Sequence, residues 1–309
     1  MHSSTGIFAS VMLALMMGQA IAAPAKSGNS PGVRSAAALV MDAHSGEVIY
    51  ELKAKDVTPI ASITKLMTAL VVLDGQQPLD EVITITNEDR WHGKGAFSRL
   101  PVGAKLTRGD LLKLALMASE NRAARVLGRN YPGGMTAFVR TMNAKAKALG
   151  MTQTRFDDPS GLSSNNVSNA RDLAKLLNAV SRDTRIREFS TLASHEVRIG
   201  RSVLGYRNTN LLIGKPDWDI LVQKTGFTND AGECLVMQAM IGDRAVNMVL
   251  LNSFGKLTRT ADARRIRKWM EAQQQPKFAM GATLPALPGG GQQTGSALDS
   301  SASALTDGQ

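Results

Sequence analysis

Strand-like segments lie near both ends of this chain, and helix-like segments lie between them. Residues 36–42 are apolar and residues 47–52 alternate, with a turn at His44-Ser45-Gly46, so a β-hairpin is predicted. Further strand-like segments lie at 203–212, 220–224, 233–241 and 245–251. Because strands bury their apolar faces by pairing into a sheet, the two ends of the chain are expected to meet in one antiparallel sheet.

Helices are predicted at residues 62–73, 110–118, 135–149 and 170–180, and a further helix follows the last strand at about 258–272. The second of these is almost entirely apolar, so we expect it to be buried. The resulting prediction is an α/β fold. It has one antiparallel sheet, a terminal helix against one face and an all-helical region against the other.

The first 22 residues are typical of a secretory signal peptide, with an uncharged apolar run at 7–17 and small residues before Ala23. A run of about 11 residues is short for a membrane span, so an uncleaved anchor is the less favoured alternative. We expect a linker at 23–35, one domain at 36–275 and a disordered tail at 276–309, where Gly, Ser, Ala and Gln dominate.

The formal net charge is +10, and an exported basic protein suits an anionic envelope polymer or a membrane surface. Dispersed charges and 5% aromatic residues argue against nucleic acid. The single cysteine, Cys234, lies in an apolar run, which indicates a buried thiol without a disulfide. The histidines are scattered, so neither a metal nor a cofactor is expected.

Ser62-Ile63-Thr64-Lys65 opens the first predicted helix, where Ser62 and Lys65 lie one turn apart on the same face. A serine hydroxyl is a weak nucleophile until a base takes its proton, and a buried lysine with a lowered pKa can be that base. The same pattern recurs at Ser253 and Lys256, but there it follows a strand in a glycine-containing turn. The sequence therefore predicts a nucleophile and its base only at Ser62 and Lys65.

Ser119-Glu120-Asn121 follows directly after the apolar helix, so Ser119 and Asn121 are expected to project into a cleft. Ser119 can relay a proton between Lys65 and a leaving group, and Asn121 can donate to a substrate amide carbonyl. Further Ser-x-Asn patterns, which begin at Ser27, Ser163 and Ser164, lack this position.

Lys224-Thr225-Gly226 occurs once and ends an apolar strand. Lys224 and Thr225 are candidates to bind a carboxylate, and Gly226 is expected to leave the strand edge open so that a substrate adds as an extra strand. The backbone N–H groups of Ser62 and Phe227 are the expected oxyanion-hole pair.

In this order the three motifs resemble the set of penicillin-binding proteins and class A β-lactamases, with Glu120 where Asp is usual. From residue 36 to about residue 272 the chain resembles the low-molecular-mass penicillin-binding proteins. Within them it is most similar to the small periplasmic D-alanyl-D-alanine endopeptidases. The matching runs are 61–69, 119–124, 131–134, 143–151, 207–210 and 224–229.

This resemblance implies a β-lactamase/D,D-peptidase-like fold, a periplasmic location and peptidoglycan as the substrate. The enzyme would attack the D-Ala carbonyl of a D-Ala–diaminopimelate cross-link, form an ester on Ser62 and hydrolyse it. β-Lactams would acylate Ser62 and remain there. We expect a monomer, whose basic surface could associate with the glycan or the membrane.

Three alternatives remain. A D-alanyl-D-alanine carboxypeptidase usually carries a second, β-rich domain and an amphipathic C-terminal helix, whereas this fold is expected to end near Ala272. A β-lactamase needs a glutamate base between the second and third motifs, but residues 121–187 contain none, and Asp157-Asp158-Pro159-Ser160-Gly161 occupies the comparable stretch. A catalytically silent penicillin-binding sensor is expected to lose Ser62 or Lys65.

Overall fold

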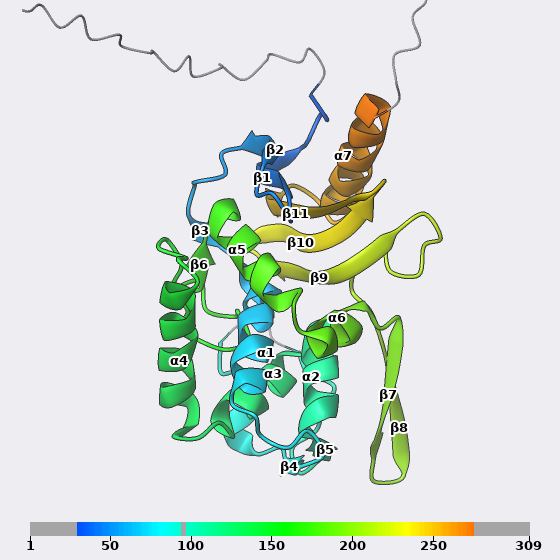
Figure 1. The fold of residues 1–309 in the computed structure, drawn as a ribbon. Coiled ribbons are helices and arrows are strands. Elements are labelled where there is room, and N and C mark those ends of the chain that lie inside the picture. Colours follow the sequence, from blue (N-terminus) through cyan, green and yellow to red (C-terminus); the bar gives the residue numbers. More distant parts are fainter. Residues whose placement is uncertain (1–29, 94–96, 275–309) are drawn as a thin grey trace, which may run out of the picture. The chain divides into compact units, whose positions relative to one another are not determined.

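The computed structural model describes residues 30–93 and 97–274. Its main sheet is antiparallel and has five strands in the order β2-β1-β11-β10-β9 (Figure 1). The sheet joins both ends of the fold, because β1 pairs with β11, where Val40 lies opposite Met248. The strands are β1 (Ser35–Asp42), β2 (Val48–Leu52), β9 (Asp219–Thr228), β10 (Gly232–Ile241) and β11 (Arg244–Ser253).

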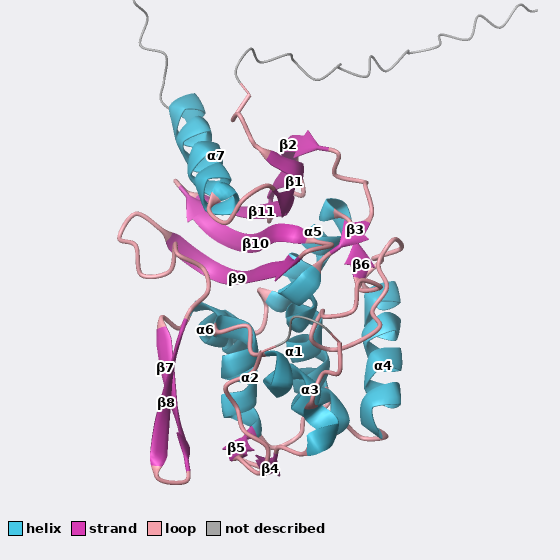
Figure 2. Cartoon of the chain, turned by 180° about the vertical axis from the view of Figure 1, so that it is seen from behind, coloured by secondary structure: helices cyan, strands magenta, loops and turns pink. Residues whose placement is uncertain are grey.

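Helices cover both faces of this sheet. Helix α7 (Thr258–Gln274) lies on one side and the other helices lie on the opposite side (Figure 2). Side chains of β1 alternate between the two cores: Val40 belongs to the core under α7, and Leu39 belongs to the core shared with the helical region. Because both faces of the sheet are buried, the sequences of these strands are nearly continuous apolar runs. The predicted fold class is confirmed.

The helical region is built around α1 (Thr64–Asp74), whose residues are all buried except the last. Helices α1, α5 and α7 agree closely with the prediction, and α2 and α4 begin one or two residues earlier than expected. Two helices were missed, α3 and α6, because both are short and rich in polar residues. The neighbours of α1 are α2 (Arg108–Met117), α3 (Asn121–Arg129), α4 (Gly134–Ala148), α5 (Ala170–Val180) and α6 (Thr184–Thr191).

Three two-stranded ribbons complete the described part. They are β3 (Thr58–Pro59) with β6 (Val167–Ser168), β4 (Val82–Thr84) with β5 (Lys105–Thr107), and β7 (Ser194–Ile199) with β8 (Ser202–Arg207). The β7–β8 ribbon stands beside α2 and α6 (Figure 1). The strand predicted at 203–212 was too long, because the Asn208 side chain donates to the carbonyl oxygens of Ser190 and Leu192 and ends the strand.

The first predicted helix also differs at its start. Ser62 lies in a 3-10 turn, η1 (Ala61–Ile63), and the α-helix begins at Thr64. Ala61 adopts a left-handed backbone conformation with φ of 47°. Its carbonyl oxygen accepts a hydrogen bond from Thr64 Oγ1, which ties the turn to the helix.

The predicted signal peptide at 1–22, most of the linker and the tail at 276–309 lie outside the described residues, so these boundaries stay predictions. Within residues 30–93 and 97–274, no helix has the length and apolar character needed to cross a membrane.

Candidate active site

The structure brings Ser62, Lys65 and Asn121 into one hydrogen-bonded group. Lys65 Nζ lies 2.7 Å from Ser62 Oγ and 2.7 Å from Asn121 Oδ1. It also donates to the carbonyl oxygen of Ser160 at 2.6 Å. A neutral amine has two N–H groups and one lone pair. If these two N–H groups donate hydrogen bonds to Asn121 and Ser160, the lone pair faces Ser62. A general base requires this arrangement.

Lys65 is fully buried, and burial lowers its pKa to about 7. The carboxylates of Asp158 and Glu120 act in the opposite direction, since negative charge favours the protonated amine. The net result is an amine that is substantially neutral near neutral pH. This agrees with the lowered pKa expected for a base.

Ser119 lies directly after α2, as predicted, and adopts a left-handed backbone with φ of 58°. The conformation is held from both sides, because the N–H groups of Ala118 and Glu120 both donate to the carbonyl oxygen of Leu114. A non-glycine residue in this region costs on the order of 1 kcal/mol, and such strain is concentrated at functional sites. Among the described residues, the Ser119 hydroxyl has no hydrogen-bond partner, so it is available to a ligand.

Glu120 has a structural role that was not predicted from the sequence. Its carboxylate accepts from the N–H of Arg122 and so caps the start of α3, and it accepts from Ser98 Oγ at 2.6 Å. The cap orients the first residue of α3, which is Asn121. Because Asn121 Oδ1 accepts from Lys65, its amide nitrogen is left to donate to a substrate.

Strand β9 places Lys224, Thr225 and Gly226 beside the turn that carries Ser62. A Cβ added to Gly226 would lie 3.1 Å from the backbone nitrogen of Ser62 and 3.0 Å from the carbonyl oxygen of Ile60. The glycine therefore allows η1 to pack closely on β9. This close packing is a reason for the glycine in addition to the open strand edge that we expected.

Lys224 is fully buried, and burial lowers its pKa well below the usual value. The nearby positive charges of Lys65 and Arg259 lower it further. Its Nζ donates to the carbonyl oxygen of Thr225 at 2.8 Å. A ligand carboxylate at this place would offset the unfavourable accumulation of positive charge.

Two residues of this region were missed from the sequence as individual candidates. Thr209 Oγ1 lies 2.6 Å from Thr225 Oγ1, and its N–H donates to Met117 at the end of α2. Arg259, on α7, donates to the carbonyl oxygens of Gly226 and Cys234 and forms an ion pair with Glu233. Neither belongs to one of the three motifs, and only the tertiary fold reveals their position.

The segment Asp158-Pro159-Ser160-Gly161 forms a further wall. The Asp158 carboxylate accepts from the N–H groups of Ser160 and Gly161, which fixes a tight turn. Carbonyl oxygens of this turn face α1, where Thr68 Oγ1 donates to Pro159 and Lys65 donates to Ser160. In the sequence this segment stands out only for its lack of a glutamate, and its role beside α1 was not predicted.

Other predicted features fall elsewhere. Cys234 is fully buried, as expected, and burial raises its pKa to about 11, so it is not a reactive thiolate.

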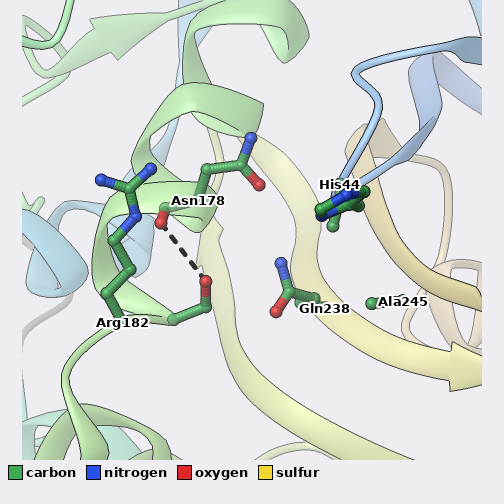
Figure 3. A pocket seen from close by; sticks show the side chains of 7 residues that line it. His44, Asn178, Arg182, Gln238 and Ala245 are labelled. Atoms are coloured by element: carbon green, nitrogen blue, oxygen red, sulfur yellow. Dashed lines mark hydrogen bonds between the residues drawn. The ribbon is translucent and has the colours of Figure 1, made fainter.

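A cavity of about 440 Å³ is lined by none of the candidate residues. Figure 3 shows the amides of Asn178 and Gln238 facing it, with His44 on another side.

Comparison with known proteins gives concordant matches. Residues 24–255 match a family model described as D-alanyl-D-alanine carboxypeptidase. A D-alanyl-D-alanine endopeptidase of Pseudomonas aeruginosa is 52% identical over 242 residues, which cover 78% of each chain. One of Escherichia coli is 46% identical over 268 residues, covering 84% of this chain and 86% of the relative. A Listeria monocytogenes penicillin-binding protein, solved in a cefotaxime-bound form, is 29% identical with a TM-score of 0.68, covering 76% of this chain and 96% of that protein.

Proposed function

The chain belongs to the D-alanyl-D-alanine carboxypeptidase family of peptidases, and on this premise we propose that it is a serine-type D,D-endopeptidase of peptidoglycan. Its substrate is the D-Ala–diaminopimelate bond that cross-links two stem peptides. The observation that supports this most strongly is the buried Lys65, with its amine 2.7 Å from the Ser62 hydroxyl and its pKa lowered to about 7.

In the acylation step, Ser62 Oγ attacks the D-Ala carbonyl carbon while its proton passes to Lys65 Nζ. The negative charge that develops on the carbonyl oxygen is stabilised by the N–H groups of Ser62 and Phe227. Both groups lie at the contact between η1 and β9, which Gly226 keeps close.

The tetrahedral intermediate then expels the amino group of the acceptor diaminopimelate. This nitrogen needs a proton, which passes from Lys65 through the Ser119 hydroxyl. The left-handed backbone of Ser119 and its lack of a partner among the described residues support this role. Water hydrolyses the Ser62 ester, so that one amide and one water yield a carboxylate and an amine.

Three further side chains position the substrate. The Asn121 side-chain nitrogen donates to a peptide carbonyl, while Lys224 and Thr225 bind the carboxylate of the residue after the scissile bond. Thr225 is oriented for this by its contact with Thr209. β-Lactams acylate Ser62 by the same first step and remain attached, because their leaving group stays tethered.

Location and partners follow from the same proposal. The enzyme acts in the periplasm after removal of residues 1–22, as a monomer, on cross-links within the wall. Its net charge of +10 favours association with the anionic glycan or a membrane surface.

Digestion of purified muropeptides tests the proposed function. Conversion of cross-linked dimers to monomers is the expected result. Trimming of pentapeptides to tetrapeptides, with dimers left intact, would instead assign a carboxypeptidase. No change in either substrate would contradict the proposal.

A further inference from the structure

A cavity of about 620 Å³ opens beside Phe227, at the end of the sheet that carries the candidate site. This volume lies within the range that binds small ligands, about 300–1,000 Å³. The proposed mechanism does not use it. Its walls come from the turn that joins β9 to β10 and from the end of β11 with the residues that follow it. The lining residues are Phe227, Asn229, Gly232, Glu233 and Asn252–Lys256.

The direction of the bound substrate decides which of its residues reaches this cavity. The carboxylate after the scissile bond lies at Lys224 and Thr225, and the scissile carbonyl lies at the N–H of Phe227. The substrate therefore runs antiparallel to β9, and the residues before the D-alanine continue past Phe227 towards Asn229. Phe227 and Asn229 both line the cavity.

The cavity combines apolar walls with an exposed lysine, Lys256, whose positive charge acts on Glu233 of the same cavity. Phe227 and Phe254 have 57% and 92% of their surface exposed, so two aromatic rings face water in the free protein. Lys256 is exposed, and the described part of the chain gives its ammonium group no hydrogen-bond or ion-pair partner. Glu233 is 9% exposed, and its carboxylate is paired with Arg259.

Such a surface is complementary to an aliphatic side chain that ends in charged groups. The methylene groups of the chain can pack on the phenyl rings, which removes apolar surface from water. A terminal carboxylate can pair with Lys256, and a terminal ammonium group can lie towards Glu233. Diaminopimelate, which carries both terminal groups on such a chain, has this chemistry, whereas lysine lacks the carboxylate.

We propose that this cavity is the subsite for the residue that precedes the D-alanine in the donor stem peptide. The cavity selects a diamino dicarboxylic acid there through Lys256 and the two phenylalanine rings. The inference rests on the proposed endopeptidase function and adds the part of the substrate that determines specificity. It gives a binding role to Lys256, from the second Ser-x-x-Lys pattern, which has no catalytic place.

The test uses two synthetic cross-linked substrates with the same acceptor. They differ only in the donor residue before the D-alanine, which is diaminopimelate in one and lysine in the other. The wild-type enzyme should prefer the diaminopimelate substrate in kcat/KM by about fivefold, through KM. Lys256→Gln should reduce this preference towards one, because it removes only the partner of the extra carboxylate.

Phe254→Ala should lower kcat/KM for both substrates by about fivefold and keep their ratio, since both share the methylene chain. Leu257→Ala is the matched control, because Leu257 is 59% exposed, follows Lys256 directly and does not line the cavity. Melting temperatures of all variants establish that they are folded.

An equal wild-type rate on both substrates, or a ratio that Lys256→Gln leaves unchanged, would overturn the subsite. A wild-type enzyme that cleaves neither substrate and is not acylated by benzylpenicillin would overturn the proposed function, and the subsite with it. Cleavage of both at equal rates overturns the subsite alone.

Discussion

Gly161 packs directly against the carbonyl oxygen of Ala61, the residue before Ser62. A Cβ at Gly161 would lie 1.9 Å from that oxygen, and the φ of Gly161 is 81°. The turn that carries the proposed nucleophile is thus held from outside by the Asp158–Gly161 segment, and this segment also provides the carbonyl that accepts from Lys65.

We therefore predict that Gly161→Ala destabilises the protein by at least about 2 kcal/mol and slows labelling by fluorescent penicillin. The overlap forces Ala61 and Ser62 to move. Gly214→Ala is the matched control, because Gly214 has a φ of 76° but no atom within 4 Å of the added methyl group. Denaturant unfolding and the labelling rate measure the two effects. Similar losses in both variants would show that backbone strain, and not the contact with Ala61, is responsible.

Ser62→Ala should abolish covalent penicillin labelling and dimer cleavage while the melting temperature stays within a few degrees. The reason is that the change removes the nucleophilic oxygen and little packing. Ser164→Ala, an exposed serine in one of the other Ser-x-Asn patterns, should retain full activity. Mass spectrometry of the acyl-enzyme is the measurement, and a stable adduct on Ser62→Ala would refute the assignment.

The acylation rate should rise with pH through about 7, because the proposed base, Lys65, can accept a proton only when it is neutral. Glu120→Gln removes a negative charge that raises the Lys65 pKa, so the midpoint of this rise should move to lower pH by a fraction of a unit. The amide can still accept from Ser98 and cap α3. Glu88→Gln, on an exposed residue, is the control. A midpoint shift to higher pH would contradict the assignment of Lys65 as the base.

Thr209→Val replaces a hydroxyl by a methyl group of similar size and leaves Thr225 without its partner at 2.6 Å. We expect KM for the dimer to rise by about fivefold to tenfold, with a smaller change in kcat, because carboxylate binding loses its orientation. Thr152→Val, on an exposed threonine, should have no effect. Steady-state kinetics on both variants distinguish these outcomes, and an unchanged KM in Thr209→Val would count against the role of Thr209.

Helices and strands with a clear hydrophobic periodicity were predicted well from the sequence. It predicted α1, α5 and α7 closely, and it predicted that the two ends of the chain share one sheet. Helix α3 was missed because its nine residues contain three arginines, which gives it little apolar character. The sequence showed only that Glu120 stands where Asp is usual, and it gave no sign that its carboxylate reaches Ser98 in a separate loop.

The candidate residues Ser62 and Lys65 could be identified from the sequence, because two residues three positions apart at the start of a helix lie on the same face. The environment that suits Lys65 to the proposed role of base comes from the tertiary fold. Its partners Asn121 and Ser160 lie 56 and 95 residues away, and its lowered pKa comes from burial by the surrounding fold. Desolvation depends on all the atoms packed around a group, and no local pattern of residues specifies them.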